Sequence, residues 1–335
     1  MLLDNCSLDI AGVSIAPFVH SQAESDWIQA RDAGVIPSSL FDLYLRANYL
    51  SFGSAPRFLR DDENVLFTYF ALIVRSIKES LADADGQLPL FAEQENLTYD
   101  PIKRFKGEPW SPDADKKARK HFRDIVISLQ AALDAMSDVV ALLLTALVPG
   151  LTVGRAQFTS IENWLLNALP EMGFVVSPAD HHLRNFHGAL QPLVHPSGSD
   201  REWLPLMRLL RNKVAHLGQP LFREVGLPHA TEERAYVFVP RQWPFLYERH
   251  FRFKGDPRSD PSRIPQMLRE TLMHQDIISF AQGLRSKVRD VIGGGVAVLT
   301  RAYLDFADFE PNQAALAQLQ ANSKSYGFEY FAETQ

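Results

Sequence analysis

The sequence predicts a mainly α-helical protein, an up-and-down helical bundle with small β-ribbon insertions. Along residues 122–147, apolar residues recur at alternating spacings of four and three, the period of helices that pack in a bundle. Ser-Pro pairs at 111–112 and 177–178 have the pattern of helix starts. Only short stretches show the alternation with a period of two that is typical of strands.

Residues 1–110 are expected to form an N-terminal region of mixed helical structure and unknown function. Residues 7–19 alternate loosely and are compatible with a hairpin, whereas residues 38–50 and 61–82 are predicted helices. Residues 83–112 are predicted to be a long surface connection and a domain boundary, because prolines and a glycine interrupt the helical pattern. These are Pro89, Pro101, Gly107, Pro109 and Pro112.

Residues 111–307 are expected to form the helical bundle. Its first helix starts with Ser111 as N-cap and Pro112 at the first helical position, and it ends at Pro149-Gly150. A second helix is predicted over 158–169, and a third begins at residues 177–180, which read SPAD. The apolar seam of the first helix consists of Phe122, Val126, Leu129, Leu133, Met136, Val140, Leu143 and Leu147.

A fourth helix is predicted to end at Gly218, in the position of a C′ glycine. Ser199 and Glu202 have the spacing of a capping box near its start. Its predicted apolar stripe consists of Trp203, Met207, Leu210, Val214 and Leu217.

The remaining chain combines a β insertion with further helix. Residues 234–254 contain two alternating stretches, AYVFV and HFRFK, which are predicted strands on either side of a proline-containing loop. Asp260-Pro261 is expected to open another long helix, and the glycines at 293–295 are expected to kink or divide it before residues 296–306. The predicted apolar seam of this helix consists of Met273, Ile277, Phe280, Leu284, Val288 and Val291. Residues 308–335 are expected to form a C-terminal helix and tail.

Composition excludes several classes of protein. The formal net charge is −6, so any binding of nucleic acid requires a local basic patch. The single cysteine, Cys6, excludes an intrachain disulfide and a zinc site built from several cysteines. The N-terminus lacks the pattern of a signal peptide, and the most apolar run, residues 139–148, is too short to span a bilayer. We therefore expect a cytoplasmic protein without membrane contact.

The segment RLLRNKVAHLG, residues 208–218, holds the strongest candidate site. At about 100° per residue, Asn212 and His216 lie one turn apart on the side of the helix opposite the apolar stripe, with Arg211 at its flank. Arginine binds phosphate through a permanently charged, bidentate fork, and histidine exchanges protons near neutral pH. The alternative is an ordinary polar face, because the helix dipole also favours a histidine in the last turn.

This segment resembles the signature of the HEPN superfamily (higher eukaryotes and prokaryotes nucleotide-binding domains), in which a histidine follows an arginine after four to six residues. Here the signature reads Arg211-Asn212-Lys213-Val214-Ala215-His216. The resemblance covers about residues 111–218, or at most residues 111–306, and implies an α-helical bundle that forms a homodimer. Two other spacings match, at 223–229 and 269–274, but neither combines an asparagine with a helix end.

The resemblance implies a metal-independent endoribonuclease of toxin or defence type, without a cofactor. In this hypothesis His216 is the general base, Arg211 stabilises the transition state, and Asn212 orients the imidazole ring. The RNA 2′-hydroxyl attacks the adjacent phosphate and leaves a 2′,3′-cyclic phosphate. A basic strand face formed by His250, Arg252 and Lys254 is the candidate for substrate binding; its alternative is a solvated edge strand.

Two other functions fit the same residues. One is a non-catalytic HEPN-like module that binds a nucleotide or a protein, and the acidic charge favours it slightly. The other is a helical scaffold in which the motif only solubilises a helix end. The histidines at 181, 182, 187 and 195 lack the spacing of a metal site, so no metal is expected.

Overall fold

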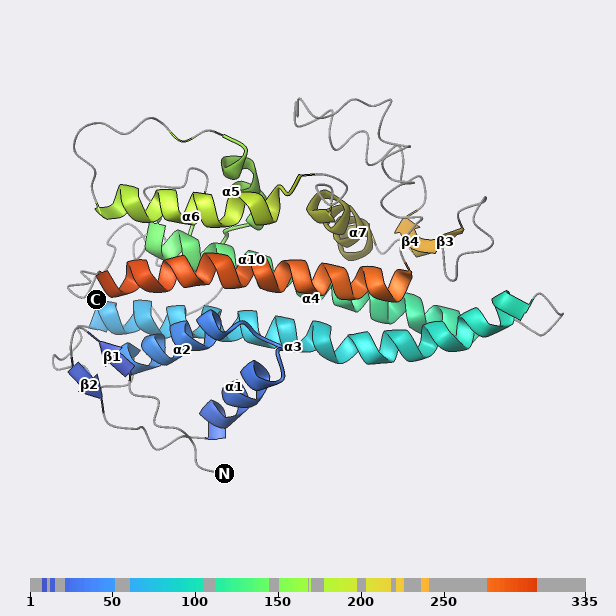
Figure 1. Ribbon diagram of the computed structural model, residues 1–335, viewed down its shortest axis with the longest axis horizontal. Helices are drawn as coiled ribbons and strands as arrows, with labels where there is room; N and C mark the ends of the chain where they lie inside the picture. The colour runs from blue at the N-terminus through green and yellow to red at the C-terminus, as the bar shows by residue number, and fades with distance from the viewer. Residues whose placement is uncertain are drawn as a thin grey trace. The chain divides into compact units, whose positions relative to one another are not determined.

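The computed structural model describes residues 8–10, 13–15, 22–51, 61–104, 112–144, 151–167, 169, 178–197, 203–217, 221–225, 236–240 and 276–305. Most of these residues lie in α-helices, so the predicted mainly α class is confirmed (Figure 1). The predicted C-terminal helix and tail lie outside the described residues.

The chain divides into two compact units. Unit 1 combines residues 1–78, 133–191 and 290–335, and unit 2 combines residues 79–132 and 192–289. Three long helices contribute one segment to each unit: α3 (Asp61–Arg104), α4 (Pro112–Leu144) and α10 (Ile277–Asp305). Both units are therefore assembled from distant parts of the sequence.

Unit 1 begins with a two-stranded antiparallel ribbon, β1 (Leu8–Ile10) and β2 (Val13–Ile15), in which Leu8 is opposite Ile15. Two helices follow, α1 (Gln22–Asp32) and α2 (Ser38–Ser51). Trp27 of α1 stacks on Tyr44 of α2 with ring centroids 4.0 Å apart, and the Lys78 ammonium lies 5.5 Å from the centroid of Trp27. No helix was predicted over 22–32. The contact between α1 and α2 joins residues that are distant in sequence, so it gives no local signal of a helix.

Unit 1 also contains α5 (Phe158–Leu165) and α6 (Pro178–Val194). The start of α6 follows the predicted Ser-Pro signal, whereas α5 ends four residues earlier than predicted. Trp164 of α5 packs against Phe186 of α6, with ring centroids 6.2 Å apart.

The glycines at 293–295 do not divide the helix, because α10 is continuous from Ile277 to Asp305; the alternative, a kink, stays a prediction. The glycines allow close helix packing. A Cβ atom at Gly293 would lie 3.1 Å from Cβ of Pro37, and Ser39 Oγ donates to the Gly293 carbonyl at 3.0 Å. A Cβ atom at Gly295 would lie 3.3 Å from side-chain atoms of both Leu190 and Met136.

We expect opposite effects from two substitutions in α10. Gly293→Val is expected to lower the free energy of unfolding by about 1–3 kcal/mol, because its side chain would overlap Pro37. Gly283→Ala is expected to raise it by about 0.5–1 kcal/mol, because no heavy atom lies within 4 Å of the added Cβ and alanine favours helix. Urea denaturation of both variants measures the difference, and equal stability of the two would contradict the packing role.

Unit 2 contains the remaining segments of the three long helices, with α7 (Trp203–Leu217), β3 (Leu221–Val225) and β4 (Tyr236–Pro240). Its aromatic core joins three helices: Phe122 of α4 lies between Phe91 of α3, at a centroid distance of 5.6 Å, and Phe280 of α10, at 6.3 Å. An ion pair between Arg285 and Asp85, 2.8 Å long, also joins α10 to α3.

The predicted surface connection over 83–112 is wrong as far as residue 104, because α3 continues through it. In unit 2 this helix buries a seam at alternating spacings: Leu81, Ala84, Phe91, Glu95 and Thr98. Pro89 occupies an exposed position of the same helix. The burial of the seam therefore outweighs the local cost of the proline, which removes one backbone hydrogen bond.

The seams predicted for α4 and α10 are largely confirmed. In α4, which begins at Pro112 as predicted, the first six seam residues are fully or almost fully buried, whereas Leu143 is half-buried. In α10, the five predicted residues from Ile277 to Val291 are buried. Residues 113–143 are long and apolar enough to cross a membrane by composition alone, but 67% of the most apolar window is buried inside the protein.

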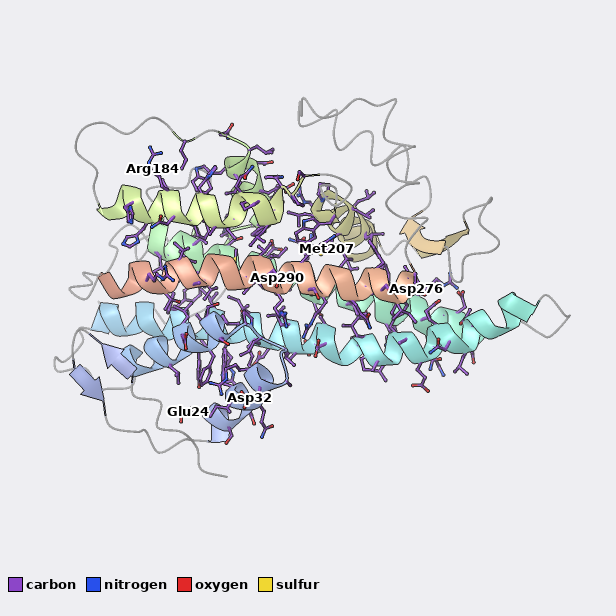
Figure 2. The ribbon with its side chains drawn as sticks, in the orientation of Figure 1. Glu24, Asp32, Arg184, Met207, Asp276 and Asp290 are labelled. Atoms are coloured by element: carbon purple, nitrogen blue, oxygen red, sulfur yellow. The ribbon has the colours of Figure 1, made fainter. Side chains whose placement is uncertain are left out.

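The helix predicted to open at Asp260 does not run continuously into α10. Asp276, labelled in Figure 2, is not helical, and its Oδ1 accepts hydrogen bonds from the backbone N–H groups of Ile278 and Ser279 at 3.0 and 2.9 Å. An aspartate in this position starts a helix. Residues 251–275 lie outside the described residues.

Strands β3 and β4 are antiparallel, with a register from Leu221 opposite Pro240 to Val225 opposite Tyr236. Strand β4 includes the last four residues of the stretch AYVFV, but its partner is β3 and not the stretch at 250–254, which the structure does not describe. The insertion predicted for residues 234–254 stays a prediction over its second half. Strand β4 also contacts α7.

Candidate functional site

The candidate motif lies at the C-terminal end of α7. The helix includes Arg211, Asn212 and His216 and ends at Leu217, one residue after His216. This end agrees with the prediction from Gly218. The described side chains of α7 run from Trp203 to Arg211, so the predicted gathering of the three motif side chains stays a prediction.

The predicted apolar stripe of α7 is buried over its described part. Trp203, Met207 and Leu210 are each at most 2% exposed, and Met207 is labelled in Figure 2. The indole N–H of Trp203 donates to the Leu193 carbonyl at 3.3 Å and anchors the start of the helix.

The opposite side of α7 is also covered along its first two turns. Arg208 lies one turn before position 212 and two turns before position 216, about 40° and 80° away around the axis. Arg208 is only 6% exposed, and Leu204, on the same side, is 1% exposed. Every residue from 203 to 210 is buried, and Arg211 is half-buried. The side of α7 that leads to the motif is therefore buried, unlike an ordinary polar helix face, which is exposed to bulk water.

Arg208 is the site residue that the sequence reasoning missed. Arginine on the polar side of an amphipathic helix is normally exposed, so its position gave no signal of burial. A guanidinium keeps its charge at any pH at which the protein is folded, and burial of a charge is costly unless other groups compensate it. Arg208 is not without a partner in this position, as a buried guanidinium requires.

The other predicted site residues are not brought into the described site. His250, Arg252 and Lys254 lie outside the described residues. Of the two other arginine–histidine spacings, the first has Arg223 in strand β3, so it does not form one helix. The second, at 269–274, lies outside the described residues.

The histidines of α6 take part in packing. His187 meets the Trp164 ring edge-on at a centroid distance of 5.0 Å, and its Nε2 lies 3.2 Å from the Asn167 carbonyl. His181 is exposed, whereas His182 is buried. Over the described part of the chain, no group of three or more His, Cys, Asp or Glu residues has the geometry to hold a metal ion.

A separate pair of carboxylates in unit 1 holds the segment between α4 and α5. Asp138 Oδ1 accepts backbone hydrogen bonds from Gly154 and Ala156 at 3.0 and 3.2 Å, and Asp134 Oδ1 accepts one from Phe158 at 3.0 Å. Burial raises the pKa of Asp138 to about 6; the two backbone hydrogen bonds lower it and the neighbouring Asp134 adds to the rise. This arrangement is structural.

The raised pKa of Asp138 predicts a pH dependence of stability. Because the folded-state pKa of about 6 lies above the ordinary aspartate pKa of 3.8, the native state binds more protons between these values, and the contribution of Asp138 to stability is lost as the pH rises through 6. The stability of the parent relative to Asp138→Asn should therefore fall by up to about 3 kcal/mol between pH 4 and 7. Urea denaturation at several pH values measures it, and a constant difference would contradict the shift.

Comparison with family models, with curated proteins and with solved structures finds no match to this chain.

Proposed function

We propose that this protein is a metal-independent endoribonuclease of the HEPN type, with Arg211, Asn212 and His216 as its active-site residues. The observation that carries the proposal is the sheltered face of α7 that leads to the motif, where Arg208 is 6% exposed and Arg211, the first motif residue, is half-buried. Anion sites with limited access to water strengthen electrostatic stabilisation of a transition state, and a solvated helix face lacks this property.

In the proposed reaction, His216 accepts the proton of the RNA 2′-hydroxyl while the 2′-oxygen attacks the adjacent phosphorus. Arg211 binds the phosphate oxygens as negative charge accumulates on them. The bond to the 5′-oxygen breaks, this oxygen takes up a proton from His216 of a second copy, and the products are a 2′,3′-cyclic phosphate and a 5′-hydroxyl. DNA is not a substrate, because it lacks the attacking hydroxyl.

A HEPN-like bundle, a homodimer and a cytoplasmic location in a toxin or defence system belong to the same proposal. The reaction needs no metal and no cofactor. Binding of RNA along His250, Arg252 and Lys254 would supply the local basic surface that a chain with a net charge of −6 requires.

The direct test is incubation of the full chain with mixed single-stranded RNA in EDTA. The parent is expected to cleave the RNA and to leave 2′,3′-cyclic phosphate ends, which mass spectrometry identifies. Arg211→Ala is expected to slow cleavage by at least about 10²-fold, because the transition-state charge loses its stabilising partner. Arg301→Ala, which removes an exposed arginine of α10, is the matched control and should cleave as the parent does.

The acidic net charge favours one alternative, a HEPN-like module that binds nucleotides or a protein without turnover. This alternative predicts intact RNA in the parent reaction. Cleavage that persists unchanged in Arg211→Ala would assign the activity to another site or to a contaminant.

A further inference from the structure

We propose that the second and third turns of α4 bind the phosphodiester backbone of the RNA substrate through a lysine cluster, Lys116, Lys117 and Lys120; this inference rests on the proposed function. All three side chains are exposed. At about 100° per residue, they lie within one sector of about 100° around the helix, with Lys120 in the middle. This part of α4 belongs to unit 2, which also contains α7.

The acidic residues of α4 do not balance the charge of the lysine cluster. Asp115 pairs with Arg119 at 2.7 Å, and Asp124 pairs with Arg123 at 2.8 Å, so these aspartates neutralise the arginines of the helix. Asp113 is exposed one turn before the cluster, but in the described part of the chain no ion pair joins it to a lysine. The cluster therefore keeps its positive charge available for an external anion.

Helix stability does not explain the lysine cluster. Lys116 and Lys120 are one turn apart, and like charges at this spacing destabilise a helix slightly. A solvated helix face usually alternates the two signs of charge. In unit 2 the signs are separated, because residues 79–98 of α3, which packs against α4, include no lysine or arginine. The exposed charged residues of that range are Glu79, Asp83 and Glu93. The cluster is therefore a local positive patch in a chain with a net charge of −6.

The side chains around the lysine cluster favour RNA over a membrane or a protein as its partner. Over residues 113–124, the exposed residues are Asp113 and the three lysines, without an apolar residue among them. A helix that binds a membrane surface inserts an apolar face, whereas the apolar face of α4 is buried. Protein interfaces are depleted in lysine. Lysine binds phosphate as a flexible point charge, which suits the irregular backbone of a single strand.

The test is the affinity of the full chain for a fluorescent, single-stranded 2′-O-methyl RNA, which lacks the attacking hydroxyl and stays uncleaved. The double variant Lys116→Gln/Lys120→Gln is expected to weaken binding by about 10–30-fold at about 0.1 M salt. The slope of log affinity against log salt concentration should become shallower by about 1.4, since each lost contact with a single strand removes about 0.7. Lys116→Arg/Lys120→Arg keeps both charges and should bind as the parent does.

The matched control is Arg301→Glu, which changes the net charge by the same two units at an exposed residue of α10 in unit 1. It should bind RNA as the parent does. Single-turnover cleavage at saturating cleavable RNA should be unchanged in the double glutamine variant, because backbone contacts stabilise bound RNA and transition state alike. Thermal unfolding, followed by circular dichroism, should show parent-like stability of both variants, because the replaced side chains are exposed.

The outcomes separate the lysine cluster from the proposed function. Parent-like affinity and salt slope in the double glutamine variant reject the cluster as an RNA-binding surface, as does an equal loss in Arg301→Glu. If the parent cleaves RNA in that case, the proposed function stands. Binding of the parent to phosphatidylserine vesicles that the double variant loses, with RNA affinity unchanged, also rejects the inference, because the surface then binds lipid. A specific loss of RNA affinity in a chain that never cleaves RNA supports the cluster and rejects the nuclease. A parent that neither binds nor cleaves RNA rejects both.

Discussion

Replacing His216 with alanine is expected to slow RNA cleavage by about 10²–10⁴-fold, the usual contribution of one positioned acid–base group. The imidazole is assigned as the base for the 2′-hydroxyl, and no other group in the proposed mechanism takes that proton. Affinity for 2′-O-methyl RNA, which lacks the attacking hydroxyl and stays uncleaved, should change little, because Arg211, the proposed phosphate-binding residue, remains. Single-turnover rates at saturating RNA measure the effect on the chemical step.

The matched control for this substitution is His181→Ala, which removes an exposed histidine of α6 in unit 1. It should cleave RNA at the rate of the parent. A His216→Ala protein that retains the parent rate would end the assignment of this residue, and a large loss in both variants would point to contaminating nuclease or to misfolding.

Phe122→Ala is expected to lower the free energy of unfolding by about 3–5 kcal/mol, the range for removal of a fully buried phenylalanine. Phe122 is 0% exposed and lies between the rings of Phe91 and Phe280, so its loss leaves a cavity where α3, α4 and α10 meet in unit 2. Urea denaturation followed by circular dichroism measures the change.

Leu72→Ala supplies the comparison for Phe122→Ala, because Leu72 of α3 is 58% exposed. It should alter the free energy of unfolding by no more than about 0.5 kcal/mol. Phe122→Leu, which fills part of the cavity, should fall between the two. A loss below 1 kcal/mol in Phe122→Ala would show that the aromatic contacts do not stabilise this core.

The predictable part of the fold is the part whose signal is local. The seams of α4 and α10 follow from apolar residues at regular spacings, and the starts of α4 and α6 follow from Ser-Pro pairs. The continuation of α3 past residue 82 was not predictable, because prolines normally end helices and the burial of a seam that includes Phe91, packed against Phe122, outweighs them. The same holds for α10, where the glycines are explained by contacts with Pro37 and Leu190.

The candidate site also combines a feature that the local sequence predicts with one that it does not. The end of α7 next to His216 was predicted from Gly218, since a glycine after a periodic apolar stripe is a local signal. The burial of Arg208 depends on what covers the polar side of α7, and the sequence of that helix does not contain this information. Whether the motif side chains meet across a homodimer stays a prediction that the RNA cleavage experiments test.

The two aspartates of α4 have a geometric consequence for the segment that follows this helix. Asp134 and Asp138 are separated by about 6.0 Å along the axis, and two residues of extended chain span about 6.6 Å. The chain is extended at Gln157, so the amides at 156 and 158 match the spacing of the two carboxylates, whereas Gly154, in a turn with φ 77°, also donates to Asp138. The length of one turn of α4 therefore fixes which backbone amides of this segment reach the two carboxylates. Inserting or deleting a single residue at 155–157 would bring the wrong amides to them.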